Sequence, residues 1–201
     1  MMKLTLKSCR VNINASAAEM AKAVGVTEDT AIKATNKAAM RQALQEHNVP
    51  IPMFFRVRTW EEYMTAVVKF TGAFVVKPAD NSGSRGIIKV TDPGNAQEVA
   101  AAYSYSLSHS RGGEVVVEEY MQGPEVSVET MSTDGVCHVI QITDKLTTGA
   151  PHFVEMGHSQ TTALDAETVE KIKFVARAAN RAVGITHGPS HTEIIVTEEG
   201  P

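Results

Sequence analysis

Cysteine is scarce in this chain of 201 residues, which contains only Cys9 and Cys137. Two cysteines so far apart in sequence form no metal-binding framework, because such sites need several ligands at close spacing. Sparing use of cysteine is also typical of proteins that work in a reducing compartment. We therefore expect a cytoplasmic protein.

Long apolar runs and an excess of positive charge are also missing. No stretch approaches the roughly 18 to 20 apolar residues of a membrane-spanning helix. The opening segment, MMKLTLKSCRVNINAS, lacks the continuous apolar region of a secretory signal. The formal net charge is -4 and the pI about 6.0, whereas nucleic-acid binders usually have a basic balance. We expect neither a membrane nor a nucleic acid among the partners.

What the chain does contain is the composition of an ordinary globular protein. It is 43% hydrophobic and 21% charged, and its length suits one or two domains with a sizeable core. Periodicity and capping signals predict helices at 16–24, 36–47, 60–70, 93–108 and 166–183. Apolar runs predict strands at 73–77, 87–91, 114–119, 125–132, 136–143 and 192–197, with a loop at 146–163 that contains a strand near 152–156.

Particular residues mark where several of these elements begin and end. Asp92, followed by proline, is the expected N-cap of the third long helix, and Asp165 caps the last helix, which Gly184 ends. Asp134-Gly135 predicts a tight hairpin. The final TEEGP looks like a second hairpin turn whose return strand is absent, so we expect a fragment of a longer protein with an unpaired edge strand.

The segment VVKPADNSGSRGI, residues 75–87, places Lys77 at the end of a buried strand and before a flexible loop. Backbone N–H groups and serine hydroxyls of such a loop can surround phosphate oxygens, glycine permits close approach, and the lysine supplies charge. The pattern matches neither the P-loop nor the GxGxxG fingerprint. A mobile hairpin connection with a solvated lysine is the alternative.

Three further groups of residues could carry chemistry. Lys37 and Arg41 lie on one face of the helix at 36–47, although a solvated pair would look the same. A buried strand ends within residues 115–129, VVVEEYMQGPEVSVE. Backbone groups at this strand end could bind the edge of a flat base, and Glu125 could accept hydrogen bonds from ribose hydroxyls. A plain strand–turn–strand is the alternative. Glu193, in an apolar strand, is a hard oxygen ligand that suits Mg²⁺.

Two other catalytic arrangements are not favoured. His187 and His191 have HxxxH spacing, but the glycine and proline between them exclude a helix, and no third zinc ligand is near in sequence. GHSQ, residues 157–160, sets a serine beside a histidine without the GxSxG elbow of a serine hydrolase.

Five segments in order resemble the ATP-grasp superfamily: NKAAMRQALQEHNVPIP, FVVKPADNSGSRGI, VVVEEYMQGPEVSVE, TDK and GITHGPSHTEIIVT. The likeness covers residues 17–201 and is to the carboxylate–amine ligase branch, whose relatives include biotin carboxylase, carbamoyl phosphate synthetase and amino-acid ligases. It implies an α+β fold in which two α+β subdomains grip a nucleotide, with the C-terminal part incomplete. The expected parts are a remnant of a preceding domain with a linker helix (1–35), a small subdomain (36–125) and a large, incomplete subdomain (126–201).

The resemblance also implies a role for each candidate site residue. Lys37 and Lys77 would bind the nucleotide phosphates. The loop 80–86, with Ser82, Gly83, Ser84 and Gly86, would be a flexible lid over the triphosphate. Glu118, Glu119, Tyr120 and Met121 would form the adenine hinge, and Glu125 would bind the ribose. Lys145 would lie near the γ-phosphate, His158 on the acylphosphate side, and Glu193 would be the first of two Mg²⁺-binding acids.

The implied activity is an ATP- and Mg²⁺-dependent ligase, with Mn²⁺ as an alternative metal. It would convert a carboxylate substrate into an acylphosphate, which an amine or similar nucleophile then attacks. The family's second metal acid would lie beyond Pro201, so a nucleotide-binding module without turnover is one alternative, and an interaction domain that binds no nucleotide is another. An exposed final strand would also permit a homodimer.

Overall fold

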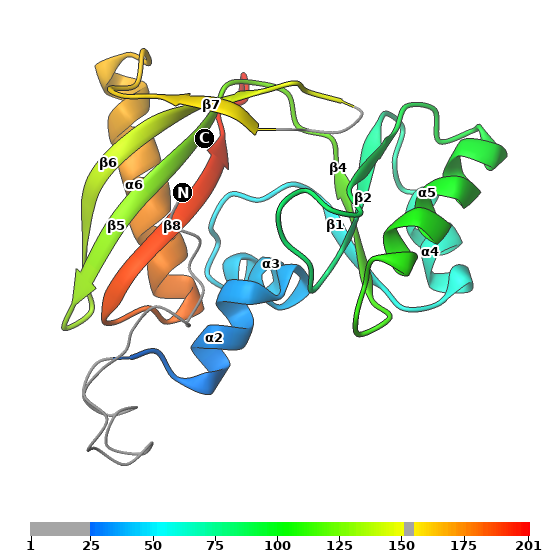
Figure 1. The fold of residues 1–201 in the computed structure, drawn as a ribbon, viewed down its shortest axis with the longest axis horizontal. Helices are drawn as coiled ribbons and strands as arrows, with labels where there is room; N and C mark the ends of the chain where they lie inside the picture. Colours follow the sequence, from blue (N-terminus) through cyan, green and yellow to red (C-terminus); the bar gives the residue numbers. More distant parts are fainter. Residues whose placement is uncertain (1–24, 151–154) are drawn as a thin grey trace.

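A computed structural model describes residues 25–150 and 155–201, which form two antiparallel four-stranded sheets with helices (Figure 1). The helices are α2 (Glu28–Thr35), α3 (Lys37–Glu46), α4 (Trp60–Val67), α5 (Ala96–Ser108) and α6 (Ala166–Val183). The strands are β1 (Phe54–Val57), β2 (Phe74–Pro78), β3 (Ile88–Val90), β4 (Val115–Glu119), β5 (Glu125–Thr133), β6 (Val136–Thr147), β7 (Glu155–Ser159) and β8 (Gly188–Ile195). The strand orders are β1-β4-β2-β3 and β7-β6-β5-β8. The predicted α+β fold with two sheet-containing parts is confirmed.

The first sheet packs against α4 and α5 through an aromatic and valine-rich core. Phe74 and Val76 of β2 are fully buried there. Tyr63 of α4 stacks on Tyr103 of α5 with ring centroids 4.7 Å apart, and its hydroxyl donates to the carbonyl oxygen of Val99 at 2.9 Å. A buried tyrosine hydroxyl needs such a partner. These contacts fix the sheet whose strand ends carry Lys77 and Glu118.

The second sheet alternates apolar and polar side chains, as expected for a sheet with one covered face. Val126 and Val128 of β5 and Ile194 of β8 pack against α6, around the fully buried Ile172. The residues between them, such as Ser127 and Glu193, therefore point to the opposite, open face. This alternation places the polar residues of three strands together on one surface.

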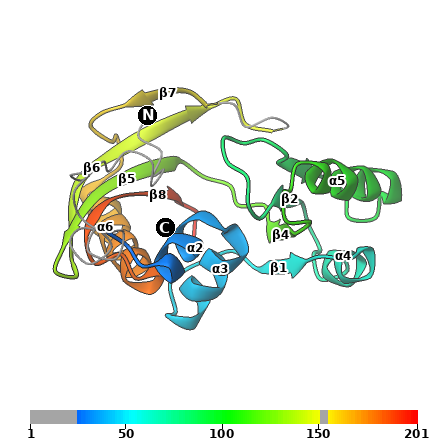
Figure 2. The same ribbon diagram turned by 60° about the horizontal axis from the view of Figure 1, so that its bottom comes forward.

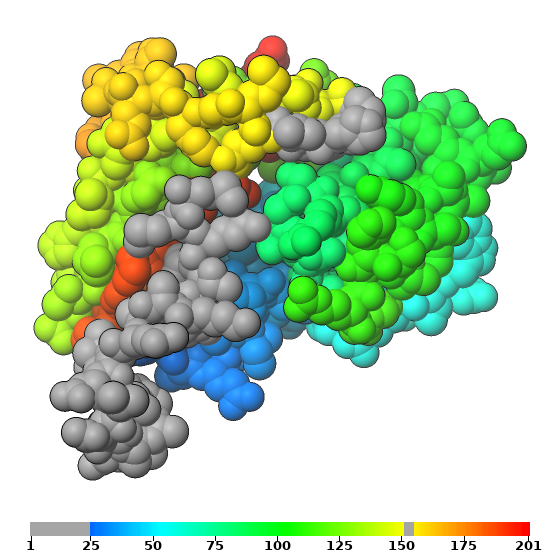
Figure 3. Space-filling model, in the orientation of Figure 1, coloured from blue at the N-terminus to red at the C-terminus, as the bar shows by residue number. Residues whose placement is uncertain are grey.

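Helix α3 joins the two halves of the molecule. Near its start, Ala38 packs with Ala79 and Val116 of the first sheet. Near its end, Leu44 enters the core between the second sheet and α6. Figure 2 shows α3 beneath the space between the sheets, and in the space-filling view the two sheet-containing bodies lie on opposite sides of α2 and α3 (Figure 3). The predicted chain division at residues 35 and 125 stays a prediction.

Several predicted element boundaries need correction. Helix α5 begins at Ala96 because Asn95 is its N-cap, accepting from the N–H groups of the first turn. The predicted cap, Asp92, instead accepts from Gly94 N at 2.8 Å in the turn before the helix. The predicted loop at 146–163 contains the end of β6 and strand β7, which is described at Glu155–Ser159. Residues 152–154 of the strand predicted near 152–156 lie outside the described residues. Strand β8 begins at Gly188, four residues before the predicted start.

Local signals elsewhere give the expected result. Asp165 caps α6, and Gly184 follows it in the left-handed conformation with φ 86°. The turn expected at the end of the chain is present, since Thr197 and Gly200 exchange backbone hydrogen bonds of 2.9 and 3.1 Å. Helix α2 and strand β1 were not predicted, and the helix predicted at 16–24 lies outside the described residues.

In the part of the chain that the structure describes, no helix is long and apolar enough to cross a membrane.

Candidate active site

Glu118 is the centre of a buried ion cluster between α3 and the first sheet. Its side chain is 2% exposed, and Lys77 Nζ lies 2.5 Å from its Oε2. Arg41 donates to both oxygens, from Nε to Oε1 at 2.8 Å and from Nη2 to Oε2 at 3.1 Å. Burial alone would raise the pKa of Glu118, but Lys77 and Arg41 hold it at about 2. Glu118 therefore stays ionised and fixes both cations at the strand end.

Lys37, the first residue of α3, lies beside this cluster. Its ammonium donates to the backbone carbonyl of Asn81 in the loop after β2. Burial and, secondarily, the charge of Lys77 lower the pKa of Lys37 to about 8, while Glu118 and Glu193 act in the opposite direction. Because Glu193 belongs to the second sheet, the charge of that sheet also acts on Lys37.

The loop 80–86 is anchored at its first residues. Asp80 accepts from two backbone N–H groups, those of Arg111 at 3.0 Å and Gly112 at 2.6 Å. Asn81 donates from Nδ2 to the carbonyl of His109 at 3.0 Å. These bonds connect the start of the loop to the segment that leads into β4.

The other end of the same loop is also fixed, while its middle is exposed. Ser106 of α5 donates to the Gly86 carbonyl at 2.7 Å, and a Cβ at Gly86 would lie only 2.5 Å from that of His109. Residues 82–85, which include Ser82, Gly83 and Ser84, are exposed. The loop can therefore move at its tip without moving its ends.

The four predicted hinge residues, which are the last two residues of β4 and the two that follow it, lie in different environments. Glu118 is buried, whereas Glu119 is exposed. The N–H of Glu119 donates to Met53 O at 2.9 Å, and that of Tyr120 donates to Ala73 O at 3.2 Å. The ring of Tyr120 lies under the ammonium of Lys89, 3.7 Å from it, a cation–π contact. Met121 is partly exposed.

Two of the four hinge residues thus use their N–H groups inside the first sheet. A base edge would have to be read by other backbone groups of this segment.

A second ion cluster lies on the open face of the second sheet. Lys145 of β6 contacts two carboxylates, Glu125 Oε1 at 2.5 Å and Glu193 Oε1 at 2.7 Å. Burial alone would lower the pKa of Lys145, but the two acids raise it. His191, whose Nε2 lies 3.8 Å from Glu193 Oε1, and Lys145 lower the pKa of Glu193 to about 2, although burial opposes this. These side chains come from three adjacent strands, β5, β6 and β8.

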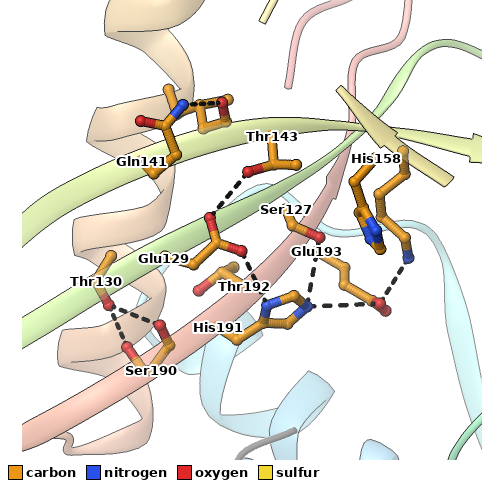
Figure 4. Close-up of polar contacts among 12 residues, drawn as sticks. Ser127, Glu129, Thr130, Gln141, Thr143, His158, Ser190, His191, Thr192 and Glu193 are labelled. Atoms are coloured by element: carbon orange, nitrogen blue, oxygen red, sulfur yellow. Dashed lines mark hydrogen bonds and ion pairs between the residues drawn. The ribbon is translucent and has the colours of Figure 1, made fainter. Parts of the chain in front are cut away.

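The histidines of the sequence analysis have separate surroundings. His158 pairs opposite Lys145 across β6 and β7 and lies 3.1 Å from Glu155 Oε1. His187 lies 3.1 Å from Asp134 near the hairpin. His191 lies between the acids of β5 and β8 (Figure 4). Within the described ranges, no group of three or more His, Cys, Asp or Glu side chains is arranged to hold a metal ion.

The donor set near Glu193 nevertheless fits Mg²⁺ bound together with a nucleotide. Mg²⁺ usually takes one or two protein carboxylates and fills its other positions with waters and phosphate oxygens. The Glu193 side chain is 58% exposed and ionised. It could therefore be one such ligand, and its lysine neighbour could contact a phosphate on the same metal.

Sequence reasoning missed some of the residues in this arrangement. It noted Arg41 but not its bidentate contact with Glu118, and it did not single out Glu129 or assign His191 a place near Glu193. The signal for His191 was available, because residues two apart in a strand share a face. The signal for Arg41 was not, because its partner is 77 residues away in sequence.

The sequence profile of the ATP-grasp domain matches residues 70–201. The chain belongs to the ATP-grasp family. It is 27% identical, over 85% of its own length, to the alanine–anticapsin ligase of Bacillus subtilis (strain 168). It is 33% identical over 83% of its length to the uncharacterized protein y4rH of Sinorhizobium fredii (strain NBRC 101917 / NGR234).

The fold agrees with this membership. The crystal structure of an L-amino acid ligase from Bacillus licheniformis superposes with a TM-score of 0.74 and 27% sequence identity, over 91% of this chain and 42% of that one. The chain spans only 34% of y4rH and 40% of the alanine–anticapsin ligase. It therefore corresponds to less than half the length of these ATP-grasp relatives.

Proposed function

We propose that this chain forms part of an ATP-dependent ligase that joins a carboxylate to an amine or similar nucleophile. The observation that carries the proposal is the meeting of two lysine–carboxylate clusters across one space, Lys37 and Lys77 from one side and Lys145 with Glu193 from the other. A bound triphosphate needs several cations from different directions. The names of two relatives, an alanine–anticapsin ligase and an L-amino acid ligase, support this class of reaction.

The first cluster would bind the nucleotide. Lys37 and Lys77 would neutralise phosphate oxygens, the segment from Glu118 to Met121 would face the base, and Glu125 would accept from ribose hydroxyls. Arg41 remains with Glu118, so the buried carboxylate would keep a cation when Lys77 turns toward phosphate. This matters because an unpaired buried charge is strongly destabilising.

The second cluster would act at the γ-phosphate. Lys145 would offset charge on the phosphoryl group as the carboxylate substrate attacks it, which gives an acylphosphate and ADP. Glu193 would be the protein ligand of Mg²⁺. When bound, Mg²⁺ neutralises and orients the phosphate oxygens.

The acylphosphate must be kept from water until the nucleophile attacks and phosphate leaves. The exposed residues 82–85, anchored at both ends, could fold over the triphosphate, with Ser82 and Ser84 as hydroxyl donors and Gly83 and Gly86 as positions of close approach. Closure of such a loop excludes water from the reaction. His158, opposite Lys145 on β7, would contact the acylphosphate side.

The first test is thermal unfolding of the chain with and without millimolar Mg-ATP. Binding to the folded state should stabilise it by about 2.7 kcal/mol when ATP is in hundredfold excess over its Kd. The shift should disappear in Lys37→Met, which removes a phosphate lysine without unpairing Glu118, and in Lys77→Ala. Lys171→Ala, on the exposed surface of α6, is the matched control and should keep the shift. The absence of a shift in the parent chain would contradict the proposed nucleotide site.

Screening for the substrates follows from a positive result. Phosphate release from Mg-ATP, measured with panels of carboxylic and amino acids, should rise only when an acceptable acid and amine are both present.

A further inference from the structure

The open face of the second sheet carries a row of polar side chains next to Glu193. Strand pairing places Ser127 of β5 opposite Glu193 of β8, and Glu129 of β5 opposite His191 of β8. Figure 4 shows the His191 ring between the two carboxylates. None of these contacts depends on chain segments outside the sheet, so the strand register itself builds the row.

The contacts in this row form a continuous chain that ends at Glu193. Thr143 Oγ1 donates to Glu129 Oε2 at 3.3 Å, and Glu129 Oε1 lies 3.4 Å from His191 Nδ1. On the other edge of the ring, Nε2 lies 3.4 Å from Ser127 Oγ and 3.8 Å from Glu193 Oε1. The ring is therefore held by one carboxylate and directed at the other.

The contacts of Glu193 determine which of its two carboxylate oxygens could bind a metal ion. Both Lys145 and His191 contact the same oxygen, Oε1. The second oxygen, Oε2, is therefore the one that would face a cation. In the proposed reaction Lys145 would also contact phosphate, so it cannot hold Glu193 in every state, whereas His191 is fixed from behind by Glu129.

We propose that Glu129 and His191 are positioning residues that hold the Glu193 carboxylate in the orientation needed to bind a divalent cation. This inference rests on the proposed function, because it takes Glu193 as the metal ligand. Groups that orient a metal ligand through hydrogen bonds typically change metal affinity by about 10- to 100-fold when they are removed. Glu129 acts through His191, so losing both should weaken metal binding little more than losing His191 alone.

The test measures Mn²⁺ binding at a saturating concentration of a non-hydrolysable ATP analogue, from the loss of the free-Mn²⁺ EPR signal. Glu129→Gln and His191→Phe should each weaken Mn²⁺ binding about 10-fold or more. The affinity of the analogue without metal should stay unchanged, because the phosphate lysines are intact. His187→Phe, four residues earlier in the chain, and Glu167→Gln, on the surface of α6, are the matched controls and should bind Mn²⁺ like the parent.

The outcomes separate this inference from the proposed function. If both variants bind Mn²⁺ within twofold of the parent while the parent binds analogue and metal, the positioning role is wrong and the nucleotide site stands. A parent that binds no analogue overturns the proposed function and this inference together. The Glu129 side chain is half-exposed, and Gln has nearly the same shape. The Glu129→Gln variant therefore still allows Mn²⁺ affinity to be measured if His191→Phe does not fold.

Discussion

At the scale of single residues, the site is organised by carboxylates that each hold one or two cations. Glu118 lies in an otherwise valine-rich strand, where burial of a lone charge would be costly. Arg41 and Lys77 offset that cost and are fixed in return. Glu193 and Glu125 hold Lys145 in the same way. Lys77 and Lys145, two of the lysines proposed to contact phosphate, are thus held by acids beside them.

Removing the Glu118 charge should destabilise the fold strongly at neutral pH. Glu118→Gln leaves two cations without their anion, and breaking a buried pair typically costs about 3 to 5 kcal/mol. Because the folded pKa of Glu118 is about 2, below its ordinary value of 4.5, its contribution is complete above pH 4.5 and is lost as the pH falls toward 2. Urea unfolding of both proteins at pH 7 and pH 3 measures this.

The difference between the two proteins should therefore be smaller at pH 3. Glu193 titrates in the same range, but it is present in both proteins and cancels in the comparison. A difference that stays constant with pH would show that Glu118 does not act through its charge.

Nucleotide binding should be accompanied by proton uptake near pH 8. Burial and Lys77 lower the pKa of Lys37 to about 8, so the residue is about half protonated at that pH. A triphosphate beside it would raise its pKa and take up about half a proton per site. Calorimetric titrations at pH 8, in buffers of different ionisation enthalpy, measure this number. Lys37→Met should remove the uptake; an uptake that persists in this variant would assign it to another group.

At the scale of elements, the chain combines rigid strand ends with one exposed loop tip. The anchors of the loop come from α5 and from the segment before β4, at Ser106 and His109. They hold its ends, whereas residues 82–85 between them are exposed. A lid needs this combination, since a loop that moved at its ends would also displace Lys77.

Trypsin should therefore cleave after Arg85 in the exposed loop tip, and Mg-ATP should slow this cleavage if the loop closes. Arg85 is exposed, and its Nε donates only within the loop, to Ser82 O at 3.3 Å. Limited digestion followed by mass spectrometry gives the rate at each site. Arg85→Gln should lose the affected fragment, and cleavage after the exposed Lys69 should not respond to nucleotide. Equal protection at both sites would indicate general stabilisation instead of loop closure.

At the scale of the whole molecule, the two sheets are joined by α3 and by the chain at Gly123-Pro124. Gly123 has φ 150°, and a Cβ there would lie 1.9 Å from the carbonyl oxygen of Val196. Val196 N in turn donates to Pro124 O at 2.8 Å. The connection between the sheets is thus packed directly against the end of β8.

Gly123→Ala should be destabilising and should also weaken nucleotide binding, because only backbone movement can remove the clash. Gly135→Ala is the matched control, since this glycine has φ 78° but nothing within 4 Å of an added Cβ. The control should cost about 1 to 2 kcal/mol from backbone strain alone, and Gly123→Ala should cost more. Urea unfolding and ATP titration measure the two effects; equal costs would contradict a steric role for Val196.

Much of the fold could be predicted because its signals are local. Asp134-Gly135 forms the hairpin, Asp165 and Gly184 bound α6, and Lys77 lies next to the last residue of β2, close to the predicted strand end. The prediction of Asp92 as the N-cap of α5 was wrong, because Asn95, three residues later, has that role. The extent of β7 toward Ser159 was not predicted, because its pairing depends on β6 and on a register shift between Leu146 and Thr147.

The sequence by itself determined the order of the elements and the types of residue at their ends, because capping, turn formation and alternation act over a few neighbouring positions. Only the tertiary structure decided which charges meet. Arg41 contacts Glu118 across 77 positions, and Lys145 contacts Glu193 across 48. Burial and the pairing of distant strands fix such contacts. The chemistry of the site depends on those distances, which no local pattern contains.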